Sequence, residues 1–267
     1  MSTYEFILSA FGDEIDQNID IQMDVLGRNG VKFIETRGIN GKNIADYTVG
    51  EMTEVYKKMQ SRGFGISSLG SPIGKIGIDD DFEPHLDKFK NCLDIAAATN
   101  TKFIRMFSFY MPQNALDANR DKVLSRWQKF IDAANGYDVT LLHENEHGIY
   151  GESADRCVDL ITTLNTPKLR ACFDPANFVM DKHDTLDAFE KLKDLTVYCH
   201  IKDASLSEHR VVPAGEGDGN VKTILDALKN RGFKGFLSIE PHLVTSDIAV
   251  GGAELFERAL NALKRIM

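Results

Sequence analysis

The chain has 267 residues, and its 43% hydrophobic content is ample for a large folded core. Its formal net charge of −9 and the absence of a basic patch exclude a nucleic-acid-binding surface, which needs clustered Lys and Arg. The four cysteines are scattered, and the N-terminus has no basic signal region. No apolar run approaches the roughly 20 residues of a membrane span. We therefore expect a cytoplasmic protein with no nucleic-acid or membrane partner.

Short apolar runs alternate with amphipathic segments of helical periodicity along the chain. Gly30 and Gly63 stand where the first two helical segments end, and Ser153 is well placed to cap a later one. The stretches 175–184 and 215–219 have the composition of loops. We expect strands at 6–10, 31–36, 64–69, 102–107, 139–144, 169–174, 196–202 and 236–240. We expect helices at 15–29, 49–62, 85–98, 121–135, 153–164, 185–192, 221–230 and 253–266.

Eight strand–helix units follow one another without a linker, which indicates a parallel sheet. Eight such units are the number of a (β/α)8 TIM barrel, so we predict an α/β fold with one barrel domain over residues 1–267. A doubly wound open sheet is the alternative. That fold often has a glycine fingerprint after its first strand, and the turn at 11–15 (FGDEI) has none.

The four later strands each end in or near an ionisable residue, namely Glu144, Asp174, His200 and Glu240. A single strand-end carboxylate is usually a helix cap or a surface charge. Four of them in successive units would meet at the carboxyl-terminal face of a barrel, where barrel active sites are built. We therefore predict that these four side chains bind one divalent metal ion.

Side-chain alternation along the strands supports this prediction. Residues two apart share a face of a strand, so the neighbours of an inward-pointing ligand must face the helices. Ala171, Cys199 and Ile239 occupy such positions and are apolar or small. His143, next to Glu144, has the wrong parity for the site. We expect His143 to lie in the outer layer and to bind no metal.

The composition of the ligand set favours particular ions. Three carboxylates and one imidazole suit Mn²⁺ first, with Mg²⁺ or Co²⁺ as alternatives. Structural zinc prefers thiolates or several histidines, so zinc is a weaker candidate.

Several segments together resemble the sugar phosphate isomerase/epimerase superfamily, the xylose-isomerase-like TIM barrels. These segments are HENEHG, FDPANF, HIKD, GEGDGN and IEPH, in this order from residue 143 onward. The resemblance implies that Glu144, Asp174, His200 and Glu240 are the metal ligands and that Glu144 and Glu240 also transfer protons. It also implies that Arg210 and the loop 215–219 bind the far end of the substrate.

The expected chemistry follows from these groups. A ketose or α-hydroxy carbonyl substrate can chelate a metal ion, which stabilises the enediolate formed when carbon loses a proton. Two carboxylates, one on each side of that plane, can epimerise the carbon, and proton transfer on one face gives isomerisation. Loss of a hydroxyl gives dehydration, as in inosose dehydratase. The sequence leaves these reactions open, and also whether the sugar is phosphorylated.

Further residues are predicted to bind substrate, each with a plainer alternative. His147 could contact hydroxyl groups or be a solvated loop histidine, and Lys202 could bind substrate oxygens. Arg105 could reach a hydroxyl or phosphate, or form an ion pair inside the barrel. The complete set of predicted substrate contacts is His147, Asn177, Lys202, Arg210, Arg105 and His242.

Three more residues have open roles. Glu14 and Glu35 could line the pocket, although Glu35 could equally pair with Arg37. Lys75 is either a loop lysine or part of a lid. Asp203 could cap or pair.

Other functions within the same fold are less consistent with the sequence. Endonuclease IV shares the scaffold but uses several zinc ions and extra histidines, and Asn177 stands where that branch has a histidine. A non-catalytic carbohydrate-binding subunit is a further alternative. We expect a small sugar as the substrate, and the oligomeric state stays open, with a homodimer as one option.

Overall fold

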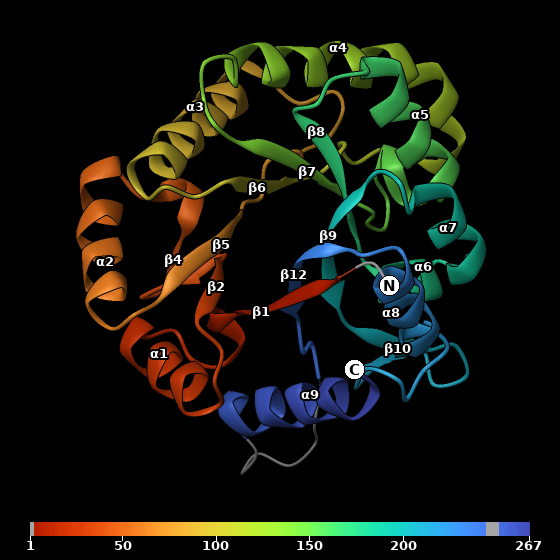
Figure 1. Cartoon of the computed structure of the whole chain (residues 1–267). Coiled ribbons are helices and arrows are strands. Elements are labelled where there is room, and N and C mark those ends of the chain that lie inside the picture. Colours follow the sequence, from red (N-terminus) through yellow and green to blue (C-terminus); the bar gives the residue numbers. More distant parts are fainter. Residues whose placement is uncertain (1–2, 244–250) are drawn as a thin grey trace.

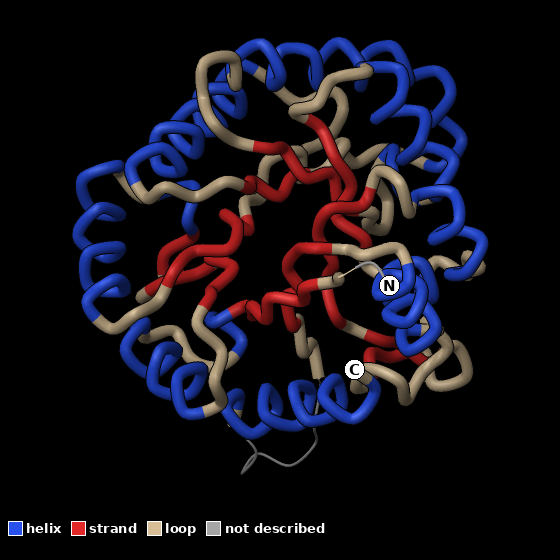
Figure 2. The backbone as a smooth tube through the Cα atoms, viewed as in Figure 1, coloured by secondary structure: helices blue, strands red, loops and turns tan. Residues whose placement is uncertain are grey.

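The computed structural model describes residues 3–243 and 251–267, and in it eight parallel strands close into a barrel surrounded by helices (Figures 1 and 2). The strands are hydrogen-bonded in the order β1-β12-β9-β8-β7-β6-β5-β2. This closed order confirms the predicted (β/α)8 barrel. The barrel strands are β1 (Glu5–Phe11), β2 (Phe33–Thr36), β5 (Gly65–Gly70), β6 (Phe103–Met106), β7 (Thr140–Glu144), β8 (Leu169–Phe173), β9 (Thr196–Ile201) and β12 (Lys234–Ile239).

Helices on the outside cover every part of the barrel wall (Figure 2). Their starts follow from local capping: Thr48 and Glu51 form a capping box at α2, and Asp184 accepts two backbone N–H groups at α7. The helices are α1 (Ile19–Arg28), α2 (Val49–Ser61), α3 (Glu83–Ala98), α4 (Leu116–Ala133), α5 (Ala154–Leu164), α6 (Pro175–Met180), α7 (Thr185–Leu192), α8 (Val221–Asn230) and α9 (Gly252–Ile266).

Some local predictions were wrong. The first helix begins at Ile19, because the 3-10 helix Gly12–Glu14 and the cap Asn18 precede it. The expected loop 175–184 contains α6. Ser153 occupies the N-cap position of α5 but makes no capping hydrogen bond with its side chain. Two hairpins were also missed: β3 (Gly38–Ile39) with β4 (Lys42–Asn43), and β10 (Asp203–Ser205) with β11 (Arg210–Val212).

The core has two layers, as side-chain alternation predicts. Leu142, Cys172 and Tyr198 form a buried cluster inside the barrel. Ala171, Cys199 and Ile239 belong instead to the large cluster between strands and helices. The inner cluster fills the barrel below the carboxyl ends of the strands, so the polar side chains at those ends lie above a packed apolar layer. Every helix within residues 3–243 and 251–267 is too short or too polar to span a bilayer.

Candidate metal centre and active site

Four side chains meet at the carboxyl ends of four barrel strands. Glu144 ends β7, Asp174 follows β8, His200 lies near the end of β9, and Glu240 follows β12. One ligand atom from each lies within 4.8 Å of the others, and all four residues are buried. The structure therefore brings together the complete set of predicted metal ligands, from positions up to 96 residues apart (144 to 240).

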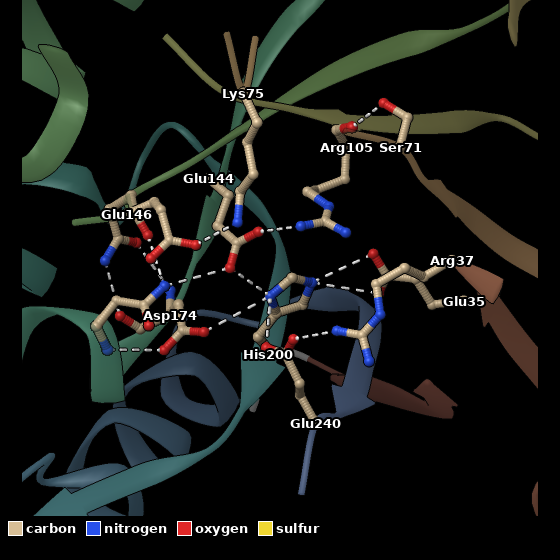
Figure 3. Close-up of polar contacts among 12 residues, drawn as sticks. Glu35, Arg37, Ser71, Lys75, Arg105, Glu144, Glu146, Asp174, His200 and Glu240 are labelled. Carbon is tan, nitrogen blue, oxygen red and sulfur yellow. Dashed lines mark hydrogen bonds and ion pairs between the residues drawn. The ribbon is translucent and has the colours of Figure 1, made fainter. Parts of the chain in front are cut away.

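His200 is the centre of this group (Figure 3). Its Nδ1 atom lies 2.9 Å from Glu144 Oε1, 3.6 Å from Glu240 Oε2 and 3.7 Å from Asp174 Oδ2. On the other side of the ring, Nε2 lies 3.2 Å from Glu35 Oε2. A carboxylate that contacts the second ring nitrogen of a metal-binding histidine fixes the orientation and tautomer of that ring.

Glu144 and Glu240, the two carboxylates predicted to transfer protons, each pair with a different arginine. Arg105 Nη1 donates to Glu144 Oε2 at 3.0 Å, and Arg37 Nη1 donates to Glu240 Oε1 at 3.1 Å. Burial alone would raise the pKa of Glu144, but the charges of His200 and Arg105 outweigh it and hold the pKa below its usual range. Burial opposes ionisation of Glu240 as well. There Lys202 is the largest of the positive charges that hold the pKa well below the usual range.

Asp174 is fixed by the chain on both sides of it. Its Oδ1 atom accepts the Asn177 backbone N–H at 3.0 Å and so caps α6. The Asn145 side chain bonds both the backbone N–H and the backbone C=O of Asp174, at 3.0 and 2.9 Å. The second oxygen, Oδ2, lies 2.8 Å from Lys202 Nζ and points into the cluster.

The residues present fit a divalent cation. Three carboxylates and one imidazole offer hard oxygen donors with a single nitrogen, and their donor atoms converge within one coordination sphere. Lys202 Nζ also lies 2.8 Å from Glu240 Oε2, so an ammonium group already sits between two of the carboxylates. This ammonium balances part of the negative charge of the three carboxylates.

A cavity of about 310 Å³ opens directly onto the cluster. Glu144 and Glu240 line it, whereas Asp174 and His200 are completely buried beneath. Four predicted substrate contacts also line the cavity, which agrees with a role at the site: Asn177, Lys202, Arg105 and His242.

Two predicted contacts lie elsewhere. The His147 side chain is 78% exposed and its Nδ1 atom lies 2.5 Å from Asp181 Oδ1, outside the lining of the cavity. Arg210 is exposed at the start of β11 and pairs with Glu208. Neither side chain faces the cavity in this arrangement, because each is drawn to a neighbouring carboxylate.

The loop 215–219 is built around Asp203 and has no residue in the cavity lining. The Asp203 carboxylate accepts backbone N–H groups from Gly215, Gly217 and Gly219, at 2.8 to 3.1 Å, and from Ala204 at 2.8 Å. A Cβ atom at Gly217 would lie 2.4 Å from Ala204 O, so this close approach requires glycine. Asp203 therefore holds the backbone of this loop, and among the described residues it neither caps a helix nor forms an ion pair.

His143 lies outside the site, as its parity predicts. Its Nε2 atom is 2.9 Å from Ser108 Oγ, and its ring packs on Trp127 at 5.8 Å. Burial lowers the pKa of His143 to about 4, so it is neutral in the outer layer.

Glu14 and Glu35 lie beside the ligand cluster, but neither is in the lining of the cavity. Glu35 does not pair with Arg37: it contacts His200 and accepts the Tyr198 hydroxyl at 2.8 Å. Arg37 instead bridges Glu240 to Asp13 and Glu14. Glu14 also accepts the His242 backbone N–H at 2.6 Å. The sequence shows polar residues just past the strand ends. It does not show which of these residues contact one another in the folded barrel.

Lys75, expected to be a loop lysine or part of a lid, lines the cavity. Its Nζ atom lies 2.7 Å from Glu146 Oε2 and 4.2 Å from the centre of the Phe107 ring. Lys75 follows β5 and Glu146 follows β7, so this pair joins two loops above the cluster (Figure 3).

Solved structures with this fold span nearly the same length. The 3-keto-D-glucoside 4-epimerase YcjR from E. coli has a TM-score of 0.74 and 16% identity, with 99% of each chain covered. The probable 3-DHS dehydratase AsbF from Bacillus anthracis has 0.76 and 15%, with 98% of this chain and 99% of that chain covered. The IolI protein with a bound zinc atom has 0.78 and 14%, with 100% and 98% covered.

At such identities these likenesses concern the fold alone. Comparison of the sequence with curated proteins finds no match. The sequence profile of the xylose isomerase-like TIM barrel family, however, matches residues 23–266. The chain therefore belongs to the xylose isomerase-like TIM barrel family.

Proposed function

We propose that this chain is a divalent-metal-dependent isomerase or epimerase of a ketose or a related α-hydroxy carbonyl sugar. The observation that carries the proposal is the convergence of Glu144, Asp174, His200 and Glu240 below an open cavity. A volume of about 310 Å³ is at the small end of ligand pockets, which range from about 300 to 1,000 Å³. It suits a single sugar unit.

The four ligands would hold Mn²⁺, with Mg²⁺ or Co²⁺ as alternatives and zinc less favoured. When bound, the cation would supply Lewis-acid stabilisation of negative charge on the substrate oxygens. The chain's own residues supply the rest. Glu35 fixes the His200 ring, and the Asn145 side chain fixes the backbone of Asp174.

Glu144 and Glu240 are placed to move protons at the substrate carbon. They come from strands separated by β8 and β9, and both reach Nδ1 of His200, Glu144 at 2.9 Å and Glu240 at 3.6 Å (Figure 3). A substrate between them would present one face to each carboxylate. One carboxylate would remove a proton and the other would return one to the opposite face, which epimerises the carbon. Return of the proton by the same carboxylate to the neighbouring carbon of the enediolate gives isomerisation.

Metal analysis followed by a panel of ketoses and keto-inositols in deuterated water tests this function. We expect deuterium at one carbon of a substrate, and no exchange with Glu144→Gln or Glu240→Gln. The surface variant Glu257→Gln, whose side chain pairs with Arg28, is the matched control and should exchange normally. Exchange that survives in both site variants would refute the proton-transfer scheme. Dehydration, the activity named for AsbF, is the alternative reaction, and the same panel would detect it as loss of water.

A further inference from the structure

Four cationic side chains line the cavity, and they differ in how fully they are paired: Arg37, Lys75, Arg105 and Lys202. Arg37 donates to three carboxylates, and Lys202 lies 2.8 Å from two. These two cations are committed to holding the site together. The other two each have a single carboxylate partner among the described residues.

Arg105 has donors to spare. Its side chain is buried and lines the cavity, and its one carboxylate partner is Glu144, through Nη1. The Nε atom is buried with no hydrogen-bond partner in the described part of the chain. A guanidinium group carries five N–H donors, and a buried donor without a partner is costly. The guanidinium group, which lines the cavity, therefore keeps donors for a hydrogen-bond acceptor bound there.

Lys75 lies on the same side of the cavity as Arg105. Its Nζ atom is 4.2 Å from the centre of the Phe107 ring, and the Arg105 guanidinium carbon is 4.6 Å from the centre of the same ring. Figure 3 shows both side chains directed toward Glu144. Two cations on one aromatic ring repel each other unless an anion lies near both. Only Glu146 is paired with Lys75 among the described residues, and both of these side chains are partly exposed.

We propose that Lys75 and Arg105 form a subsite for an anionic group of the substrate, a carboxylate or a phosphate, so that the sugar is acidic or phosphorylated. This inference rests on the proposed function for the identity of the ligand as a sugar. Glu146 is the counter-ion of Lys75 while the subsite is empty, and the anion of the substrate displaces it. Binding of that anion between the β5 and β7 loops would orient the opposite end of the sugar toward the ligand cluster.

Calorimetric titration with three probes tests the subsite: D-fructose, D-fructose 6-phosphate and 5-keto-D-gluconate. We expect at least one anionic probe to bind about tenfold or more tighter than D-fructose, as expected of hydrogen bonds to charged groups. The probe that binds tighter shows whether phosphate or carboxylate is the natural group. Lys75→Gln should abolish that preference, and Glu146→Gln should increase it because the competing carboxylate is gone.

Lys75 is the better residue to replace in this test, because replacing Arg105 would also remove a contact of Glu144. Lys57→Gln on α2, a residue with a 65% exposed side chain, is the matched control and should keep the preference. Equal affinity for all three probes in the wild type, or a preference retained in Lys75→Gln, would overturn the subsite. Manganese binding is measured on the same proteins. Its absence would refute the proposed function and leave the anion preference as a separate result.

Discussion

Lys202 Nζ lies 2.8 Å from Asp174 Oδ2, inside the cluster of predicted metal ligands. Both side chains are buried, and the ammonium group also reaches Glu240. Burial alone would lower the pKa of Lys202, but Asp174 and Glu240 raise it well above its usual range. The lysine is therefore a fixed positive charge that balances the carboxylates.

This balance predicts the behaviour of Lys202→Met. In metal-free protein the variant removes the lysine partner of buried Asp174 and leaves Glu240 with Arg37, and breaking such a buried pair typically costs about 3–5 kcal/mol. A divalent cation can replace the lost charge, so Mn²⁺ should raise the urea midpoint of the variant more than that of the wild type. Urea unfolding in EDTA measures the loss of stability, and urea unfolding in Mn²⁺ measures the gain from the cation. Lys57→Met is the surface control. An equal gain from Mn²⁺ in the two proteins would contradict this role.

The carboxylate of Asp203 predicts a local effect on the loop 215–219. Asp203→Ala removes the acceptor of four backbone N–H groups, and a buried donor without a partner costs about 1–3 kcal/mol. We expect faster hydrogen exchange at Gly215, Gly217 and Gly219 and a lower melting temperature. Asp203→Asn keeps one acceptor oxygen, so its exchange rates and melting temperature should lie between those of the wild type and Asp203→Ala. Unchanged exchange in Asp203→Ala would show that the loop does not depend on this residue.

Much of the fold was predictable because it repeats. Strand and helix patterns recur eight times, and each repeat is long enough to show its periodicity. The helix α6 and the hairpin β10–β11 were missed for the opposite reason: six residues, or two strands of three, are too short to show a period.

The ligand set was predictable for a similar reason. Equivalent strand ends carry Glu144, Asp174, His200 and Glu240, and a barrel places such ends on one face. The ion pairs that cross the barrel were not predictable from the sequence. Arg37 and Glu240 are 203 positions apart, and Arg37 has other acidic groups nearby, so only the folded geometry selects its partners.

His85 predicts a pH dependence of stability. Its Nε2 atom accepts the Gly74 backbone N–H at 2.7 Å, so the neutral ring is the one that fits. Burial first, then the charges of Lys88 and Arg126, lower the pKa of His85 from 6.5 to about 4. Below pH 6.5 the unfolded chain takes up the proton before the folded chain does. This contribution to stability is therefore complete above pH 6.5 and is lost as the pH falls toward 4.

His85→Gln should remove this part of the pH dependence, because glutamine does not titrate and its side-chain oxygen can still accept the Gly74 N–H. The difference amounts to no more than about 3 kcal/mol. Urea unfolding of wild type and variant between pH 4 and 8 measures it, and His209→Gln in an exposed loop is the control. Parallel stability curves for wild type and His85→Gln would disprove the assignment.

Gly74 predicts how tightly the Lys75 loop is held against the barrel. Its φ of +92° is a left-handed conformation, and a Cβ atom would lie 2.0 Å from the backbone oxygen of Phe107. Gly74→Ala should therefore lower the unfolding free energy by more than about 1 kcal/mol. Gly50→Ala on α2, where a Cβ atom meets nothing within 4 Å, should instead raise it by about 0.5–1 kcal/mol. Urea unfolding of both variants measures this contrast. Equal effects would mean that the loop can move away from Phe107 without cost.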